Sequence, residues 1–507
     1  MKNSILKLYV ILIAFSLVTF SCADLDVINE NAPDATRALA NPSDVKALAG
    51  GSFRTWHNAI QEYDGLALAM GVMADHFTCS WGNQAMRDMS WEPRINSFNN
   101  SLTYSYFGAL RFQWQESYSC ISSANLALQR LNNGMNFGTD GDENDLVEAF
   151  CYLASGVSHG YLGLVFDQAN VIAWDADIAG LELMPWSDVI DASLVLLDKA
   201  IQICNTSSFT VPLGWVAGQA MTNVELGQLA SSYAARILAG SSRTKAHNDN
   251  IDWGRVLNYA QDGLTSDFAP ELGDAYDWYD MYFIYARYSG WGRTDMRVMN
   301  AMNHAYPSRW PSDNVSWNTI DGLDPGPANP ADDNRITTDF QYLSSNAFPP
   351  DRGYYHYSHY RFRRYDYVTT NTWYGNQPKP SFLAWEVKLL EAEALLRTTG
   401  NSTGALAILN DPAGPRKTRG LCADITETDV ATVLRYILDE KDIECHLTGA
   451  GISFFDMRRT DRLQPSTLLH FPVPATELEI SGLPHYTIIA VPDGVNGSAG
   501  DWTGWDN

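Results

Sequence analysis

The sequence lacks several motifs that mark common catalytic and metal-binding sites. It contains neither a phosphate-binding Gly-x-x-x-x-Gly-Lys-Ser/Thr loop nor a zinc-binding His-Glu-x-x-His pattern. Its seven cysteines form no Cys-x-x-Cys pair, so a metal site built on thiolates is not expected. Carboxylates are plentiful, but a catalytic pair is recognised only by its separation in space. We therefore predict no enzyme activity, no cofactor and no metal site.

Positive charge is scarce relative to negative charge. The 507 residues include 34 Lys and Arg against 59 Asp and Glu, which gives a net charge of −25 and a pI near 4.6. Such an acidic chain repels nucleic acid and anionic lipid surfaces. No internal run approaches the roughly 18 apolar residues of a membrane span. We expect no nucleic-acid partner, and a mild preference for neutral ligands.

The extreme N-terminus has the pattern of a targeting segment. Lys2 and Lys7 precede an apolar run over residues 8–20, and Ser21-Cys22 follows it. This pattern resembles a bacterial lipobox, which predicts a signal peptide over residues 1–21 and lipidation of Cys22. Several acyl chains would hold the protein firmly on a membrane without a spanning helix. The alternative is an ordinary signal peptide followed by an incidental cysteine.

Six cysteines remain after Cys22, and fifteen complete pairings are possible among them. Several lie in apolar helical stretches, where a buried free thiol is the commoner state. We predict no disulfide among Cys79, Cys120, Cys151, Cys204, Cys422 and Cys445.

Apolar residues at helical spacing recur through the N-terminal half of the chain. Within it, the pattern Leu226-Gly227-x-x-Ala230-x-x-Tyr233 is similar to part of a tetratricopeptide helix. Helix pairs of this kind must stack to bury their apolar faces. The pattern by itself predicts an all-α protein of helical pairs, with helices near residues 44–59, 66–73, 101–131, 146–166, 188–201, 223–238 and 252–263.

The C-terminal quarter shows the strongest pattern. A helix over residues 382–397 is stopped by Gly400, and a shorter helix follows over residues 405–410. A third helix is capped within residues 426–429 and runs to about Leu447. We expect solvated or capping roles for the carboxylates on these helices, namely Glu391, Glu393, Glu440 and Glu444.

This order of elements resembles the SusD/RagB family, the surface glycan-binding lipoproteins of Bacteroidetes. The family run Glu-Arg-x-x-Glu-Leu, Gly, Asp-Leu-x-Arg and Phe-Pro-Ile-Pro-x-x-Glu appears here at residues 440–445, 449, 456–459 and 471–477. An Asp-x-Arg segment within residues 332–340 also resembles the family. Lys441 stands where Arg is usual. The resemblance implies a non-catalytic, lipid-anchored protein on the cell surface of the outer membrane, acting with a SusC-like TonB-dependent transporter.

The resemblance also implies an all-α fold of stacked, tetratricopeptide-like helical pairs forming a curved scaffold, in one SusD-like domain over residues 22–507. Within it we expect a tether over residues 22–42, an N-terminal helical half over residues 43–267 and a C-terminal helical region over residues 381–507. Between the halves, residues 268–380 form a loop-rich insert dense in Tyr and Trp. Long loop regions in helical proteins are commonly functional.

The aromatic residues give the chemical argument about the ligand. A sugar ring stacks its C–H face on an exposed Trp or Tyr, and neighbouring polar side chains hydrogen-bond its hydroxyls. The alternative for each aromatic residue is a place in a small core beneath the insert, while Trp114, Trp253 and Trp385, on helical stripes, are expected in the main core. The candidate ligand-binding residues are Trp81, Asn83, Arg87, Trp278, Tyr279, Trp291, Arg293 and Trp317.

Three functional readings remain open. The first is capture of a neutral polysaccharide or oligosaccharide, such as a β-glucan, and its delivery to the transporter. The second is peptide binding within the same family, in which the pocket would recognise backbone and termini. The third is a lipid-anchored glycosidase with two carboxylates across a cleft.

Overall fold

The computed structural model describes residues 39–79, 82–91, 94, 96–306, 327, 332–344, 358–370 and 372–488. The described residues fall into two units, which divide between Val45 and Lys46. At the end of the first unit, the Ser43 backbone N–H donates to Asn41 Oδ1 at 3.0 Å, at the start of α3 (Pro42–Gln61). The predicted signal peptide and the predicted lipidation site, Cys22, lie outside the described residues.

Helices are the predominant regular structure of the described residues, as the sequence pattern predicts. Those before the insert are α4 (Ala67–Met73), α5 (Met86–Ser90), α6 (Phe107–Asn132), α7 (Asn144–Val165), α8 (Trp186–Thr206), α9 (Asn223–Gly240), α10 (Lys245–Asn248) and α11 (Trp253–Gln261). Those after it are α16 (Ala384–Thr399), α17 (Ser402–Leu409), α18 (Pro415–Thr418), α19 (Val430–Glu444), α20 (Ile452–Arg459) and α21 (Ala475–Ile480).

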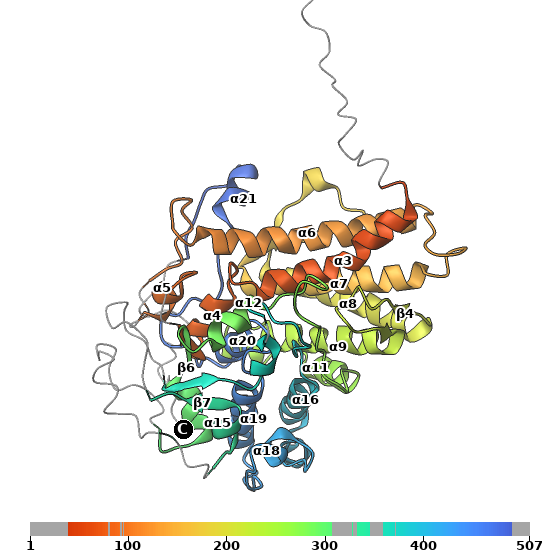
Figure 1. The fold of residues 1–507 in the computed structure, drawn as a ribbon. Helices are drawn as coiled ribbons and strands as arrows, with labels where there is room; N and C mark the ends of the chain where they lie inside the picture. The colour runs from red at the N-terminus through yellow and green to blue at the C-terminus, as the bar shows by residue number, and fades with distance from the viewer. Residues whose placement is uncertain are drawn as a thin grey trace, which may run out of the picture. The chain divides into compact units, whose positions relative to one another are not determined.

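Successive helices pack on one another in chain order. Helix α7 packs between α6 and α8, and α9 links α8 to α11 and α16 (Figure 1). Small residues let α7 approach its neighbours closely, since a Cβ on Gly160 would lie 2.4 Å from Ile237 Cδ1 of α9. The predicted all-α fold of stacked helical pairs is therefore confirmed.

The helix limits follow local chemistry. Helix α19 begins where Asp429 accepts a hydrogen bond from the Thr432 backbone N–H at 3.0 Å. Helix α16 ends at Gly400, whose φ of 64° suits glycine. Helix α6 begins at Phe107, later than predicted, because successive turns occupy residues 101–106.

Residues expected in the core are found there. Trp114 and Trp253 are buried, and the half-buried Trp385 packs on the edge of a core cluster. No helix of the described residues is long and apolar enough to cross a membrane. Five of the six remaining cysteines are described as free and buried, namely Cys120, Cys151, Cys204, Cys422 and Cys445.

The insert contains more regular structure than its composition predicts. Its described helices are α12 (Met281–Arg287), α13 (Met296–Met302), α15 (Arg335–Thr338) and the 3₁₀ turn η3 (Asp366–Thr369). Its strand β6 (Gly292–Thr294) pairs with β1 (Phe77–Cys79), and β7 (Phe340–Tyr342) pairs with β8 (Tyr360–Phe362). Elsewhere, short antiparallel pairs join β2 (Gln168–Asn170) to β3 (Leu183–Pro185) and β4 (Thr210–Val211) to β5 (Met221–Thr222), and the 3₁₀ turn η1 spans Ile178–Gly180.

Buried ion pairs join the insert to the C-terminal helices. The fully buried Arg335 donates to Asp333 Oδ2 at 2.6 Å and to both carboxylate oxygens of Glu440 at 2.7 and 2.8 Å. Glu444, one turn further along α19, accepts from the same guanidinium at 3.3 Å. The Asp-x-Arg segment and the acidic run of α19 therefore form one charge network.

The structure corrects the expected roles of three carboxylates. Glu393, Glu440 and Glu444 are buried and paired with arginines, rather than solvated or capping; Glu393 accepts from Arg459 at 2.5 and 2.6 Å. The prediction was wrong because several of the paired arginines come from segments distant in the sequence, such as Arg459 for Glu393 and Arg335 for Glu440. Glu391 instead forms a surface pair with Lys388.

A buried pair on α16 should be essential for stability. Arg236 of α9 donates to Glu386 at 2.7 and 2.8 Å, and Glu386 is fully buried. Glu386→Ala leaves this buried guanidinium without its carboxylate partner and with only the Tyr161 hydroxyl, at 3.2 Å, as acceptor. We therefore expect the free energy of unfolding, measured by urea denaturation, to fall by about 3–5 kcal/mol.

Lys388→Ala, which breaks the more exposed Lys388–Glu391 pair on the same helix, should cost about 0–1 kcal/mol. Equal losses in the two variants would contradict the assignment of stability to the buried pair.

Candidate functional site

An aromatic pocket of about 370 Å³ lies where the insert meets the N-terminal half. Its size falls within the usual range for small-molecule sites, about 300–1,000 Å³. It combines residues that follow α3 and β1 with residues of α12 and of two later turns. We call this site the aromatic pocket; its lining is Tyr63, Asn83, Met281, Tyr285, Trp291 and Trp373.

Trp291 is the centre of an aromatic cluster. Its ring centroid lies 5.0 Å from that of Tyr285, 4.7 Å from that of Tyr288 and 5.2 Å from that of Trp373. These tilted and edge-to-face contacts fix the rings relative to one another. Trp373 remains 40% exposed and Tyr288 38% exposed, so apolar ring faces stay open to a ligand.

The polar groups of the pocket are few and uncharged. Asn83 Nδ2 donates to the Tyr63 hydroxyl at 2.6 Å and reaches the Tyr285 hydroxyl at 3.5 Å. Among the described residues that line it there is no Lys, Arg, Asp or Glu. A bound carboxylate would therefore lose hydration without gaining a counter-charge, whereas a neutral, hydroxylated ring loses less.

A buried ion pair positions the helix that carries Tyr285. Asp280 caps α12 by accepting from the Phe283 backbone N–H at 2.9 Å, and its other oxygen accepts from Lys379 Nζ at 2.5 Å. Lys379 also donates to the Leu447 carbonyl at 2.6 Å. Burial raises the pKa of Asp280 and lowers the pKa of Lys379, and each charge partly opposes the shift of the other.

The turn after α12 brings Trp291 back over Tyr285. This turn requires glycine at position 292, because a Cβ there would lie 1.8 Å from the Ala286 carbonyl oxygen. Arg293 is 2% exposed and donates to the Ser289 and Gly292 carbonyl oxygens. Its side chain therefore braces the turn beneath the pocket instead of reaching into it.

The predicted site residues do not all lie at the aromatic pocket. Asn83 and Trp291 line the aromatic pocket. Arg87 is exposed and lies over the Trp91 ring at 5.4 Å, and the half-buried Tyr279 donates to Asp274 at 2.9 Å; neither lines the pocket. Two more of the predicted residues, Trp81 and Trp317, lie outside the described residues.

Trp278 is corrected from a candidate ligand contact to a core residue. It is fully buried, with its ring 4.6 Å from His57 and 5.9 Å from Phe53. A tryptophan without an exposed face offers no surface to a sugar. The lining residues that we did not select are Tyr63, Met281, Tyr285 and Trp373.

A serine-hydrolase-like pattern also occurs at residues 400–404, Gly-Asn-Ser-Thr-Gly. In hydrolases the Gly-x-Ser-x-Gly serine stands on a sharp turn between a strand and a helix. Here the segment joins helix α16 to helix α17, and Asn401 caps α17 through the Gly404 backbone N–H. The pattern is therefore a helix connection. Among the described residues, no cluster of His, Cys, Asp or Glu could hold a metal ion.

Comparison with known proteins identifies the fold. No protein-family model matches the sequence, and no curated protein matches it. Solved structures do match. A SusD superfamily protein of Bacteroides vulgatus superposes with a TM-score of 0.59 at 13% identity, covering 87% of this chain and 97% of its own.

Two further structures agree. Surface glycan-binding protein A of Bacteroides uniformis has a TM-score of 0.58 at 13% identity, covering 87% of this chain and 98% of its own. A SusD-like carbohydrate-binding protein of B. vulgatus has a TM-score of 0.55 at 15% identity, with 83% of each chain covered. The chain is thus a helical-scaffold protein with an inserted aromatic region. Its fold is that of the SusD superfamily, as the sequence resemblance predicts.

His57 should make stability depend on pH. Burial, reinforced by the nearby Lys379 ammonium, lowers the pKa of His57 from 6.5 to about 3. Below pH 6.5 the His57 imidazole of the unfolded chain therefore takes up a proton, whereas that of the folded chain stays neutral. The contribution of the neutral His57 to the free energy of unfolding is thus fully present above pH 6.5 and is lost progressively toward pH 3.

As the pH falls from 7.5 to 5, protonation of His57 in the unfolded chain should lower the free energy of unfolding by about 2 kcal/mol. Chemical denaturation across that range should show a shallower decline for His57→Gln than for the unchanged protein. Identical slopes for the two proteins would contradict the burial of a neutral imidazole.

Proposed function

We propose that the protein is a non-catalytic glycan-binding protein whose aromatic pocket captures a neutral oligosaccharide or polysaccharide. The observation that carries the proposal is the cluster of Tyr285, Trp291 and Trp373 around a pocket whose described lining residues are all uncharged. Aromatic faces match the C–H faces of sugar rings. The Asn83 amide and the tyrosine hydroxyls supply donors and acceptors for the sugar rim.

The structural neighbours support the same class of ligand. Two of the matched structures are described as a surface glycan-binding protein and a SusD-like carbohydrate-binding protein. Each match covers most of both chains, so the helical scaffold that carries the insert and its pocket has the same fold in this chain and in the matched structures. Their low identity leaves the particular glycan to be decided by this pocket's own residues.

Anchoring and delivery form the second part of the proposal. Lipidation of Cys22 after removal of residues 1–21 would tether the protein to the outer membrane at the cell surface. There it would pass captured glycan to a SusC-like TonB-dependent transporter. A β-glucan is the first ligand to test, because it is neutral and presents repeated apolar ring faces.

Affinity electrophoresis tests the pocket directly. The mature chain, starting after Cys22, is run through gels that contain barley β-glucan, xyloglucan or an acidic polysaccharide. Trp291→Ala or Trp373→Ala should weaken binding to the retarding neutral glycan by about tenfold or more, since burying an aromatic face contributes roughly 1.5–3 kcal/mol.

Tyr367→Ala is the matched control, because Tyr367 is 48% exposed but does not line the pocket. It should bind like the unchanged protein. Absence of retardation by every glycan, or retardation that both tryptophan variants retain, would contradict the proposal. Binding of a peptide library to the same pocket would instead favour the peptide-binding reading.

A further inference from the structure

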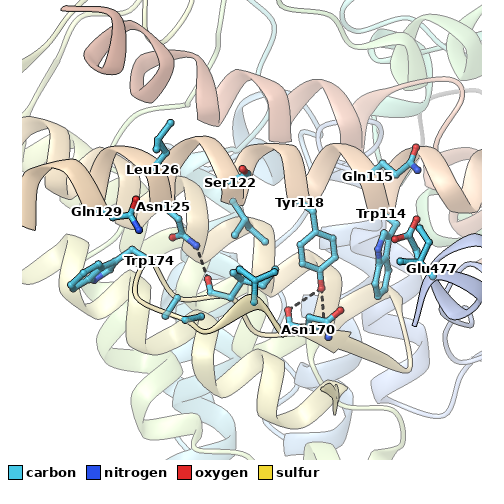
Figure 2. A pocket seen from close by; sticks show the side chains of 16 residues that line it. Trp114, Gln115, Tyr118, Ser122, Asn125, Leu126, Gln129, Asn170, Trp174 and Glu477 are labelled. Atoms are coloured by element: carbon cyan, nitrogen blue, oxygen red, sulfur yellow. Dashed lines mark hydrogen bonds between the residues drawn. The ribbon is translucent and has the colours of Figure 1, made fainter. Parts of the chain in front are cut away.

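A second and larger hollow, of about 610 Å³, runs along α6 in a different part of the fold. One wall is α6, and the other is formed by the segment after β2 with η1 and by α21. Figure 2 shows Trp174 beside Gln129 at one end and Trp114 beside Glu477 at the other, with Tyr118 between them. We call this hollow the α6 groove.

The wall opposite α6 is held in place by hydrogen bonds from α6. The Tyr118 hydroxyl donates to the Asn170 carbonyl at 2.9 Å and accepts from the Asn170 backbone N–H at 2.7 Å. Asn125 Nδ2 donates to the Ile172 carbonyl at 2.7 Å (Figure 2). The Ile172 backbone N–H also donates to the buried His159 ring at 3.1 Å. The segment that leads to Trp174 is therefore fixed, and the groove is preformed.

A row of polar side chains follows the groove along α6. Gln115, Ser122 and Gln129 are exposed, line the groove and recur every seven residues on one face of the helix. Within the described chain these three side chains make no hydrogen bond. From position 115 to position 129 the helix rises roughly 21 Å, which suits an extended chain better than a single ring.

The charge of the groove narrows the class of ligand. The described residues of its lining include one carboxylate, Glu477, and no Lys or Arg. An anionic chain would meet no counter-charge there. Free amides and a hydroxyl offer both donors and acceptors to hydroxyl groups, and the half-buried Trp174 offers an aromatic surface for stacking.

We infer that the α6 groove is a second glycan-binding site, which holds an extended internal stretch of a neutral polysaccharide while the aromatic pocket holds another. The inference rests on the proposed function and adds a site to it. Two weak sites on one polymer bind together more tightly than either alone, because the second contact is intramolecular.

The test is a pair of substitutions on the groove face of α6. Ser122→Arg places a long side chain in the groove from an exposed position, and Trp174→Ala removes the aromatic surface. Ser119→Arg is the matched control, because Ser119 is exposed on the same helix but does not line the groove. Binding to barley β-glucan is measured by affinity electrophoresis, and to a β-glucan oligosaccharide by calorimetry.

We expect Ser122→Arg and Trp174→Ala each to weaken polysaccharide binding by roughly tenfold, and to lower the oligosaccharide stoichiometry from two to one. Ser119→Arg should change neither. Unchanged binding and stoichiometry in both groove variants, while Trp373→Ala abolishes retardation, would overturn the second site and leave the aromatic pocket standing. If every variant, Trp373→Ala included, kept both its retardation by the polysaccharide and its oligosaccharide stoichiometry, both sites would be overturned.

Discussion

The geometry of the aromatic pocket depends on the buried pair between Asp280 and Lys379. Both side chains are fully buried, and Lys379 adds a hydrogen bond to the Leu447 carbonyl just beyond α19. One ammonium thus connects the start of α12, the end of the insert and the C-terminal helices. Removing one partner of such a pair leaves an uncompensated buried charge, so the pocket and the scaffold are stabilised together.

The same principle extends across the insert. Arg335 binds Asp333 and Glu440, and Arg297 binds Asp442 at 2.5 Å. These pairs fasten α15 and α13, two short helices of the insert, onto α19. A ligand site built from turns loses affinity when its loops must be ordered on binding. Buried charge therefore provides here the preorganisation that helices provide elsewhere in the fold.

The fold could be predicted because its signals are local. Apolar spacing, the Asp429 cap and the Gly400 stop each operate within a few residues. The site could be predicted only in part, since Trp278 and Trp291 are indistinguishable in an aromatic-rich sequence, although one is core and the other lines a pocket. Burial is decided by contacts such as that between Trp278 and His57. No short-range pattern encodes such contacts.

The central claim is that an uncharged aromatic pocket selects a neutral glycan. Calorimetry should compare a neutral β-glucan oligosaccharide with a uronic-acid oligosaccharide of equal length, at low and high salt. We predict that the neutral oligosaccharide binds with an affinity that salt does not change, and that the acidic one binds far more weakly. Tighter binding of the acidic oligosaccharide, weakened by salt, would contradict the account, since it would require a cationic site.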